Sequence, residues 1–325
     1  MKALVLLQPG SPDTLQIKEV PIPEPLKGEV RVKVYAVGLN PADYKFMQRG
    51  FATWQYPFIP GLDVAGTIDK IGEWVTNYNI GDDVYYHGDF SQPGGFAQYA
   101  ITTAHTIAAL PKNLSYIQAA ALPCAGFTAF QALYHKLHVK SGQTILIQGG
   151  AGGVGGFAIQ LAKREGLKII STASNHNFAW VRQLGADVVL DYNSEDIVLR
   201  VQELTQGRGV DSIVDAVSSA SATMGFNMLA FGGSIVCIAG LPDFSGMKSF
   251  SKAFSVHDLA LGGAYLSGDI KAQDMLVKIG KEFGDLVSQS NINPMIQEVI
   301  KFEEIPNGLI QLSERKVKGK IVATI

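Results

Sequence analysis

The segment best suited to chemistry is a glycine cluster that follows an apolar run. Thr144 to Gln148 has the β-branched content of a buried parallel strand, and Gly150, Gly152 and Gly155 follow it in the pattern Gly-x-Gly-x-x-Gly. Glycines at this spacing allow a tight turn and let backbone N–H groups approach a pyrophosphate. The positive end of the next helix attracts the phosphate charge. The sequence therefore predicts a dinucleotide site formed by Gly150, Gly152, Gly153, Val154 and Gly155.

A plain glycine-rich loop is the alternative explanation of this cluster. Ala158, Leu161 and Ala162 follow it at helical spacing, so strand, loop and helix come in the order that a dinucleotide site requires. This order favours the nucleotide interpretation.

The residues that would select the dinucleotide stand at the end of the next predicted strand. An NAD site has an Asp or Glu about 20 residues after the glycines, where it binds the ribose 2′-hydroxyl. This chain has Ser174, Asn175 and His176 there, and Tyr192 follows the third strand. These side chains donate hydrogen bonds or add positive charge, and no carboxylate there repels a 2′-phosphate. We therefore expect NADP(H), bound in part by Ser174, Asn175 and Tyr192. A helix-capping role for Ser174 and Asn175 is the alternative, and the two roles can coexist.

Length and composition indicate a compact protein of two domains. The chain has 325 residues, more than the roughly 100 to 200 of a single domain. Its 27 basic and 29 acidic residues leave no general attraction to nucleic acid or to an anionic membrane. The first residues are too few for a signal peptide core, and no apolar run reaches the roughly 20 residues of a membrane-spanning helix. We expect a soluble, cytoplasmic protein that binds neither nucleic acid nor membrane.

The cysteine content limits the metal chemistry. Cys124 and Cys237 are far apart in the sequence and flanked by apolar residues, as buried free thiols usually are. Two cysteines cannot form a four-cysteine structural zinc site. We expect free thiols and no disulfide framework.

The pattern of predicted elements changes near residue 144. Before it lie short, turn-punctuated strand candidates, typical of a small β-rich domain, at residues 3–7, 30–37, 64–71, 83–86 and 96–101. After two helical runs, strands at 144–148, 168–172, 188–190, 212–215 and 234–238 alternate with helices. Such alternation predicts a parallel sheet covered on both faces. From about Asn293 the chain returns to strand-like segments such as 320–324, which we expect to complete the first domain.

The order of segments resembles the medium-chain dehydrogenase/reductase superfamily, in particular its zinc-independent branch of quinone oxidoreductases and enone reductases. The resemblance covers nearly the whole chain and rests on the glycine cluster and on the segments 38–45, 57–66, 81–85, 94–99 and 119–123. It implies an α/β fold with two domains. A GroES-like β-rich catalytic domain would comprise residues 1–123 and 291–325, and a Rossmann domain with a doubly wound parallel sheet would comprise residues 124–290. A homodimer follows from the resemblance of segment 262–268 to a subunit-pairing stretch.

The same resemblance implies a reaction without metal. Zinc alcohol dehydrogenases of the superfamily carry a cysteine where this chain has Asn40, and a His-Glu pair where it has Leu62 and Asp63. The loop with four cysteines found in many zinc members is also absent. Without a Lewis acid, oxidation of simple alcohols is disfavoured. The resemblance therefore implies hydride transfer from NADPH to a quinone or an α,β-unsaturated carbonyl, which needs positioning and hydrogen bonds to the developing oxyanion.

Three residues are candidates for the catalytic role. By resemblance, Asn40 faces the nicotinamide, where its amide would hold substrate or water; a turn residue before Pro41 is the alternative. Asp43 and Lys45 belong to an Asn-Pro-x-Asp-x-Lys pattern found in several enone reductases. Lys45 would donate to a carbonyl or to the cofactor, and Asp43 would orient Lys45 or the ribose. A surface ion pair is the alternative.

The remaining candidates concern the cofactor and the acceptor. Thr128 matches a threonine beside the nicotinamide carboxamide, although a hydroxyl inside a helix is the alternative, and Ala239 completes the cofactor-binding set. An aromatic-rich stretch would form either a flat quinone pocket or ordinary core, and it contains Tyr44, Phe46, Phe51, Trp54 and Tyr56. The alternative function is an NADPH-binding regulatory protein with little turnover.

Overall fold

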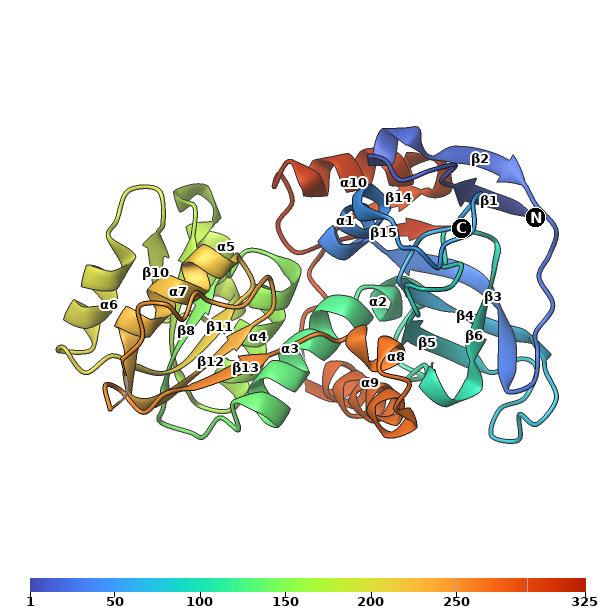
Figure 1. Cartoon of the computed structure of the whole chain (residues 1–325). Helices are drawn as coiled ribbons and strands as arrows, with labels where there is room; N and C mark the ends of the chain where they lie inside the picture. Colours follow the sequence, from blue (N-terminus) through green and yellow to red (C-terminus); the bar gives the residue numbers. More distant parts are fainter. Residues whose placement is uncertain (249, 291) are drawn as a thin grey trace. The chain divides into compact units, whose positions relative to one another are not determined.

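The chain folds into two compact units. The computed structural model describes residues 1–248, 250–290 and 292–325. Unit 1 comprises Met1–Phe127 and Leu261–Ile325, and unit 2 comprises Thr128–Ala260 (Figure 1). The first boundary lies near the expected one, but unit 2 ends at 260 rather than at 290.

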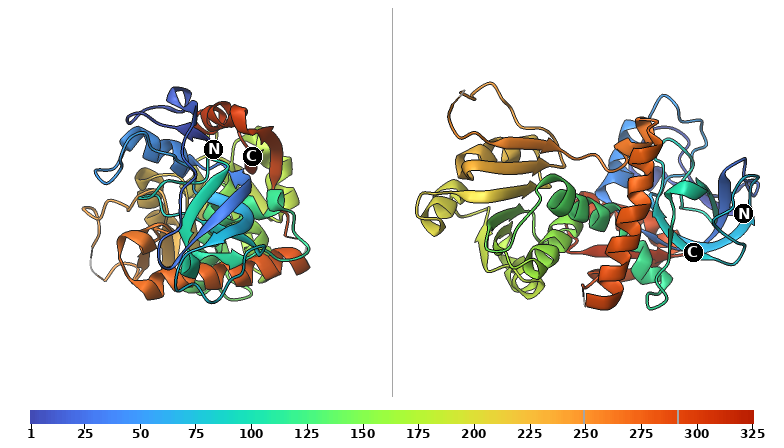
Figure 2. Two further views of the ribbon diagram at one scale, coloured as in Figure 1. Left: turned by 90° about the vertical axis from the view of Figure 1, so that its right-hand side faces the viewer. Right: turned by 90° about the horizontal axis from the view of Figure 1, so that it is seen from below.

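The long helix α9 (Ile270–Ser290) accounts for the difference at the second boundary. It packs on β5 (Asp83–His87) and β7 (Ala108–Ala109) of unit 1 (Figure 2). Tyr85 on β5 donates its hydroxyl to Gly280 O at 2.5 Å, and the buried Phe283 ring lies against Gly126. These contacts join residues after 260 to the first unit.

Unit 2 is the predicted parallel α/β domain. Its described residues form a six-stranded sheet in the order β10-β9-β8-β11-β12-β13, and every pairing is parallel. The strands are β8 (Thr144–Gln148), β9 (Lys168–Ala173), β10 (Val188–Asp191), β11 (Val210–Asp215), β12 (Leu229–Cys237) and β13 (Ser255–Asp258). The helices are α3 (Thr128–Phe130), α4 (Gly153–Arg164), α5 (Phe178–Leu184), α6 (Ile197–Leu204) and α7 (Ser219–Met228). This is the doubly wound order, which reverses direction between β8 and β11.

Right-handed crossovers explain how the sheet of unit 2 is covered. The crossovers through α4 and α5 run in one direction along the sheet, and those through α6 and α7 run in the other, so the two pairs cover opposite faces. α4 packs beside α5, and α6 packs beside α7 (Figure 1). The central strands are therefore buried on both sides, as the apolar run Ile145–Ile147 requires.

Unit 1 is the predicted β-rich domain. A seven-stranded sheet runs in the order β14-β15-β3-β4-β5-β7, with β6 also paired to β3, and β1 pairs with β2 separately. The strands not yet given are β1 (Lys2–Val5), β2 (Gln16–Glu19), β3 (Glu29–Gly38), β4 (Asp63–Ile71), β6 (Tyr99–Thr103), β14 (Ile296–Lys301) and β15 (Lys320–Thr324). The helices are α1 (Pro41–Arg49), α2 (Tyr116–Ala120), α8 (Gly263–Leu266) and α10 (Ile305–Ser313). The α/β fold class with these two architectures is confirmed.

The core of unit 1 follows from alternation along its longest strand. Val30, Val32 and Val34 on β3 are buried, while the residues between them are exposed or half-buried. β15 pairs antiparallel with β3, so the last strand of the chain closes on the first half of the sequence.

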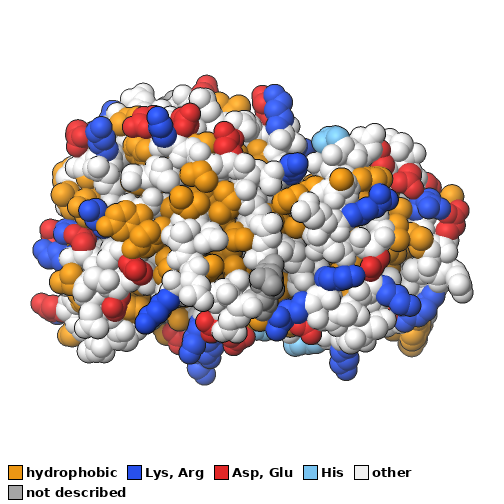
Figure 3. Space-filling view, turned by 180° about the vertical axis from the view of Figure 1, so that it is seen from behind, with side chains coloured by type: hydrophobic (Ala, Val, Ile, Leu, Met, Phe, Trp, Pro, Cys, Tyr) orange, Lys and Arg blue, Asp and Glu red, His pale blue; other side chains and the backbone are white. Residues whose placement is uncertain are grey.

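Two surface observations concern membranes and charged partners. Among the described residues, no helix is long and apolar enough to cross a membrane. Figure 3 shows Lys and Arg side chains interspersed with Asp and Glu on one face of the molecule. That face therefore lacks a continuous basic stripe.

Replacing Gly126 tests the attachment of α9. A Cβ at Gly126 would lie 2.1 Å from Phe283 Cε1, so Gly126→Ala should lower the free energy of unfolding by about 1 to 3 kcal/mol. Urea unfolding measures the change. Adding Phe283→Leu removes the ring. The free energy of unfolding of the double variant should therefore fall by less than the sum of the decreases in the two single variants. Additive losses would contradict the packing described.

Candidate functional site

The glycine turn after β8 has two glycines that packing requires and one that it does not. A Cβ at Gly150 would lie 2.1 Å from Ser171 Oγ, and one at Gly155 would lie 2.3 Å from Gly149 O. At Gly152 the nearest such atom is Gly149 O at 3.6 Å, an ordinary contact. Gly152 is also the residue before the first turn of α4, where free N–H groups point outward. Close approach of a ligand explains a glycine here better than the fold itself does.

The other predicted cofactor residues of unit 2 mostly lie at the same edge of the sheet. Ser174 follows β9, Tyr192 follows β10 and the exposed Ala239 follows β12, so all three stand at the carboxyl ends of parallel strands. Ligands of doubly wound sheets bind at this edge, near the point where strand order reverses. Thr128, which is buried, lies instead at the start of α3.

The surroundings of Ser174 are polar and lack a carboxylate from its own strand. Ser174 Oγ lies 3.2 Å from His176 Nε2 and accepts a hydrogen bond from Asn177 Nδ2 at 3.2 Å. Its side chain makes no capping hydrogen bond to the short helical turn 175–177, so the capping alternative receives no support from this hydroxyl. Asn175 is exposed beside it.

One carboxylate, Asp191, stands at the end of the neighbouring strand β10. Its Oδ1 accepts hydrogen bonds from Asn193 N and Nδ2, and its Oδ2 accepts one from Ser194 Oγ. The N–H of Asn193 is the main reason why the pKa of Asp191 is lowered, and the nearby His176 contributes. The charge of Asp191 is therefore engaged by its own loop.

A polar pair at this edge, Gln148 and Asp215, was not predicted from the sequence. Gln148 Nε2 donates to Asp215 Oδ2 at 2.8 Å, which joins the ends of β8 and β11 where strand order reverses. Asp215 also accepts hydrogen bonds from Val217 N and Ser221 Oγ and thereby shapes the loop before α7. Burial is the largest cause of the raised pKa of Asp215. The strand-end Asp followed by Ser218-x-x-Ser221, a helix-capping spacing, was the available signal.

In unit 1, the segment Asn40 to Lys45 forms the start of α1, which separates the two charged candidates. Asp43 is 2% exposed and accepts hydrogen bonds from Asn40 N at 2.8 Å and Leu62 N at 3.1 Å. Lys45 is exposed, because residues two apart point in different directions on a helix. The structure therefore does not bring Asp43 and Lys45 together.

The amide of Asn40 is fully engaged inside unit 1. Its Nδ2 donates to Asp63 Oδ2 at 2.8 Å and to Gly38 O at 3.3 Å, and its Oδ1 accepts from Lys320 Nζ at 2.5 Å. Asn40 is 2% exposed. The geometry suits a residue that positions its neighbours.

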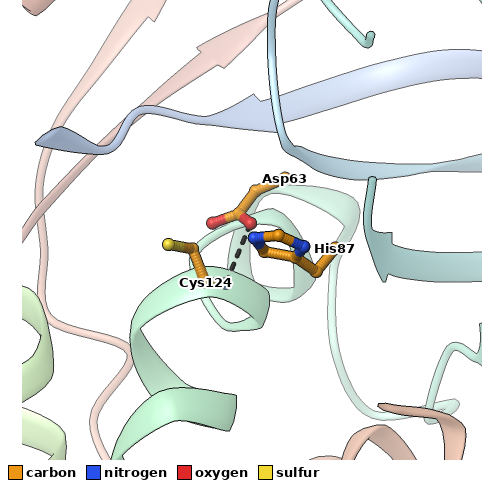
Figure 4. Close-up of side chains that lie close together, drawn as sticks. All are labelled: Asp63, His87 and Cys124. Atoms are coloured by element: carbon orange, nitrogen blue, oxygen red, sulfur yellow. Dashed lines mark hydrogen bonds between the residues drawn. The ribbon is translucent and has the colours of Figure 1, made fainter. Parts of the chain in front are cut away.

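Asp63 is the centre of this buried group. Its Oδ1 accepts a hydrogen bond from Cys124 N at 2.8 Å, while Lys320 Nζ lies 3.5 Å from its Oδ2. Figure 4 shows the side chains of Asp63, His87 and Cys124 converging from β4, β5 and the helical turn η3 (Pro123–Phe127). Burial raises the pKa of Asp63 to about 6, although Lys320 opposes this shift.

Burial also shifts the neighbouring titratable groups. It raises the pKa of Asp43 to about 7, with a further rise from the charge of Asp63. It lowers the pKa of His87 to about 4 and raises the pKa of the Cys124 thiol well above its usual range. At neutral pH, His87 is a neutral imidazole and Cys124 is a thiol.

The group formed by Asp63, His87 and Cys124 can be compared with a zinc site. Ligand atoms of Asp63, His87 and Cys124 lie within 4.8 Å of one another, and these are ligand types that zinc accepts. However, both oxygens of Asp63 already accept hydrogen bonds, and the Lys320 ammonium stands beside one of them. A second cation would meet that positive charge. The arrangement as it stands does not fit a zinc ion.

The aromatic stretch forms mostly core, with one shallow depression. Trp54 stacks on Phe58 with ring centroids 3.8 Å apart, and Phe46 and Phe51 contact the Phe90 ring. The walls of the depression include Asp43, Phe46, Trp54, Phe58 and Phe90. Of the five predicted aromatic residues, Phe46 and Trp54 line it, whereas Tyr44, Phe51 and Tyr56 do not.

Comparisons with known proteins find two family models along the chain, the second of which extends past residue 260 into the segment that packs with unit 1. The "Alcohol dehydrogenase GroES-like domain" family model matches residues 26–112, and the "Zinc-binding dehydrogenase" model matches residues 153–283. The chain is 32% identical to the quinone oxidoreductase of Sus scrofa over 267 residues, 80% of each chain. It is 35% identical to the 2-methylene-furan-3-one reductase of Solanum lycopersicum over 253 residues, 74% of this chain and 62% of that one.

A solved structure gives the same result. A mycobacterial protein complexed with NADPH superposes with a TM-score of 0.87 at 26% identity, and the match covers all of both chains. The resemblance found in the sequence is confirmed by these comparisons.

Gly152→Ala tests whether the glycine turn holds a ligand. Since its Cβ has room in the protein, thermal unfolding should be unchanged, but affinity for NADPH should fall about 10-fold or more if the turn holds the pyrophosphate, because the methyl group would occupy its path. Isothermal titration calorimetry measures the affinity. Gly246→Ala, at another uncrowded glycine of unit 2, is the matched control. Unchanged affinity in Gly152→Ala would exclude a phosphate at this turn.

Asp43→Asn tests the burial of the carboxyl group. The folded-state pKa of Asp43 is raised to about 7, so its contribution to wild-type stability is present near pH 4 and is lost as pH rises through 7. Asn does not ionise, so the stability of the variant does not fall in this way as pH rises. Its unfolding free energy relative to wild type should therefore increase between pH 5 and pH 8, by an amount on the order of a few kcal/mol. Urea unfolding at both pH values measures it, with the exposed Asp285→Asn as control. A pH-independent difference would refute the raised pKa.

Proposed function

Because the chain belongs to the medium-chain dehydrogenase/reductase superfamily, among the relatives of quinone oxidoreductases, we propose that it transfers hydride from NADPH to a quinone or an α,β-unsaturated carbonyl without a metal ion. The observation that carries the proposal is the carboxyl edge of the unit 2 sheet. There, an uncrowded Gly152 opens α4, and Ser174 stands where an NAD site has a carboxylate. The names of the pig and tomato relatives support the two acceptor classes.

The preference for NADPH rests on the donors around Ser174. Ser174 Oγ, His176 and Asn177 Nδ2 form one polar group next to the exposed Tyr192, and Asp191 is engaged by its own loop. A 2′-phosphate can accept hydrogen bonds from this group, and the His176 ring offers a further donor. The NADPH in the mycobacterial structure supports the same cofactor.

The nicotinamide supplies the hydride when it is bound, and the chain's residues bind, orient and shield. We assign cofactor binding to the glycine turn, Ser174, Asn175 and Tyr192, with Thr128 and Ala239 as further contacts. Asn40 and Asp43 act as positioning residues at the start of α1, since their polar atoms are engaged within the protein. Lys45 is exposed and remains the candidate donor to an acceptor carbonyl.

The depression beside Asp43 is the proposed acceptor surface of unit 1. Phe46, Trp54 and Phe90 give it flat apolar walls, which suit a quinone ring or a conjugated enone. Asp43 lies in the wall, and its pKa near 7 keeps a fraction of the carboxyl groups protonated at neutral pH. A homodimer is part of the proposal, and size-exclusion chromatography with light scattering tests it.

NADPH oxidation followed by absorbance tests the activity directly. The acceptors are 1,4-benzoquinone, 9,10-phenanthrenequinone and a series of short enones, each assayed with NADPH and NADH, before and after EDTA treatment. We expect rapid, NADPH-preferring turnover that the chelator does not reduce. Tight NADPH binding without turnover on any acceptor would favour the regulatory alternative, and chelator-sensitive alcohol oxidation would overturn the metal-free proposal.

Ser174→Asp tests cofactor selection. A carboxylate at this position repels a 2′-phosphate and accepts hydrogen bonds from a 2′-hydroxyl, so kcat/KM for NADPH should fall about 10-fold or more while that for NADH is kept or rises. Ser174→Ala is the control for loss of the hydroxyl alone, and it should weaken NADPH less. Equal losses with both cofactors would show that Ser174 does not face the 2′ position.

A further inference from the structure

The group around Asp63 combines metal-type ligands with a built-in positive charge. Asp63, His87 and Cys124 come from β4, β5 and η3 of one unit, and their ligand atoms lie within 4.8 Å of one another. Asp63 is fully buried and His87 is 4% exposed, and His87 Nδ1 has no hydrogen-bond partner among the described residues. A buried ring nitrogen without a partner needs an explanation.

The three side chains approach the geometry of a divalent cation site without reaching it. Ligands of a tetrahedral zinc or cobalt ion, bound at about 2.0 to 2.3 Å, are about 3.3 to 3.8 Å apart. Atoms within 4.8 Å of one another would need to close by up to about 1.5 Å. Neutral His87 has a lone pair to offer, and a metal ion displaces the proton of a thiol such as Cys124. The positions of these three ligand atoms therefore do not by themselves exclude a divalent cation.

Lys320 changes the electrostatics of this group. It lies on β15 and is 2% exposed, and its Nζ donates to Leu39 O at 3.1 Å and to Asn40 Oδ1 at 2.5 Å. The same nitrogen is 3.5 Å from Asp63 Oδ2. The ammonium thus has two fixed acceptors and a carboxylate counter-ion, all of them buried.

The charge of Lys320 acts on all three metal-type ligands. It opposes the rise in the pKa values of Asp63 and Cys124 and helps to lower that of His87. A divalent ion at the three ligands would share Asp63 with this ammonium and would be repelled by it. Without Lys320, one carboxylate and one thiolate would balance the two charges of the ion.

We propose that the Lys320 ammonium takes the place of a metal ion beside Asp63, His87 and Cys124, and that it excludes divalent cations from a ligand set otherwise able to bind one. Lys320 is the counter-charge of the buried Asp63 carboxylate. The group therefore needs no metal supply and offers no open coordination position. The proposal concerns unit 1 alone and stands or falls independently of the hydride-transfer activity.

Lys320→Met and Lys320→Gln, titrated with Co²⁺, test the exclusion. Both remove the charge, and Gln can still donate a hydrogen bond to Asn40. Each folded variant should bind one Co²⁺ per chain at least about 100-fold more tightly than wild type, with a thiolate-to-cobalt band in the near ultraviolet. Circular dichroism checks folding. If a variant unfolds without metal, recovery of its thermal transition by Zn²⁺ is the readout.

Three control variants make the result specific. Adding Cys124→Ser to Lys320→Met should abolish the cobalt band, while Lys320→Arg should exclude Co²⁺ as wild type does. Lys316→Met removes an exposed lysine that pairs with Glu314 and should leave binding unchanged. The proposal is overturned if wild type already binds Co²⁺ through Cys124. It is equally overturned if neither neutral variant binds Co²⁺ or is restored by Zn²⁺.

Discussion

The buried carboxylate of Asp63 is the interaction on which the candidate site of unit 1 depends. It accepts hydrogen bonds from Asn40 at the start of α1 and from Cys124 in η3, and it faces Lys320 on β15. These segments are far apart in the sequence, and each of them contacts the Asp63 carboxylate. Removing a partner from a buried ion pair typically costs about 3 to 5 kcal/mol, because the remaining charge is left uncompensated. The orientation of α1, and with it the depression beside Asp43, therefore depends on this group.

The cation beside Asp63 is an ammonium group rather than a metal ion, and this difference affects which reactions the site can support. A metal ion can bind an alcohol and lower its pKa, whereas a lysine ammonium is a point charge without coordination positions. Lys320 is also buried, so its charge serves the protein interior rather than a substrate. The acceptors proposed above, quinones and enones, are already electron-poor and do not need activation by a metal ion. Unit 2 has its own polar site, with a glycine turn and polar strand ends at one edge of a parallel sheet.

The local sequence pattern was enough to predict much of the fold, but it did not predict the buried group around Asp63. The sequence predicts β8, α5 and β15 to the residue, because apolar periodicity and flanking turn residues act over a few positions. The contact of Lys320 with Asn40 spans 280 residues, so no local pattern reveals it. Likewise, the isolated His87 gave no sequence signal, and α9 joins unit 1 through tertiary packing. Resemblance located Asn40 and Asp43 but did not reveal that their polar atoms are engaged internally.

Transfer of deuterium from labelled NADPH to an enone tests the central claim most directly. NADPH carrying deuterium at C4, prepared separately on each face of the ring, would be incubated with the protein and a short enone, and the product analysed by mass spectrometry and NMR. Direct hydride transfer predicts deuterium at the β-carbon from one labelled face only, with the α-hydrogen taken from solvent. Product without deuterium from either face, or no product despite bound NADPH, would contradict direct hydride transfer by this protein.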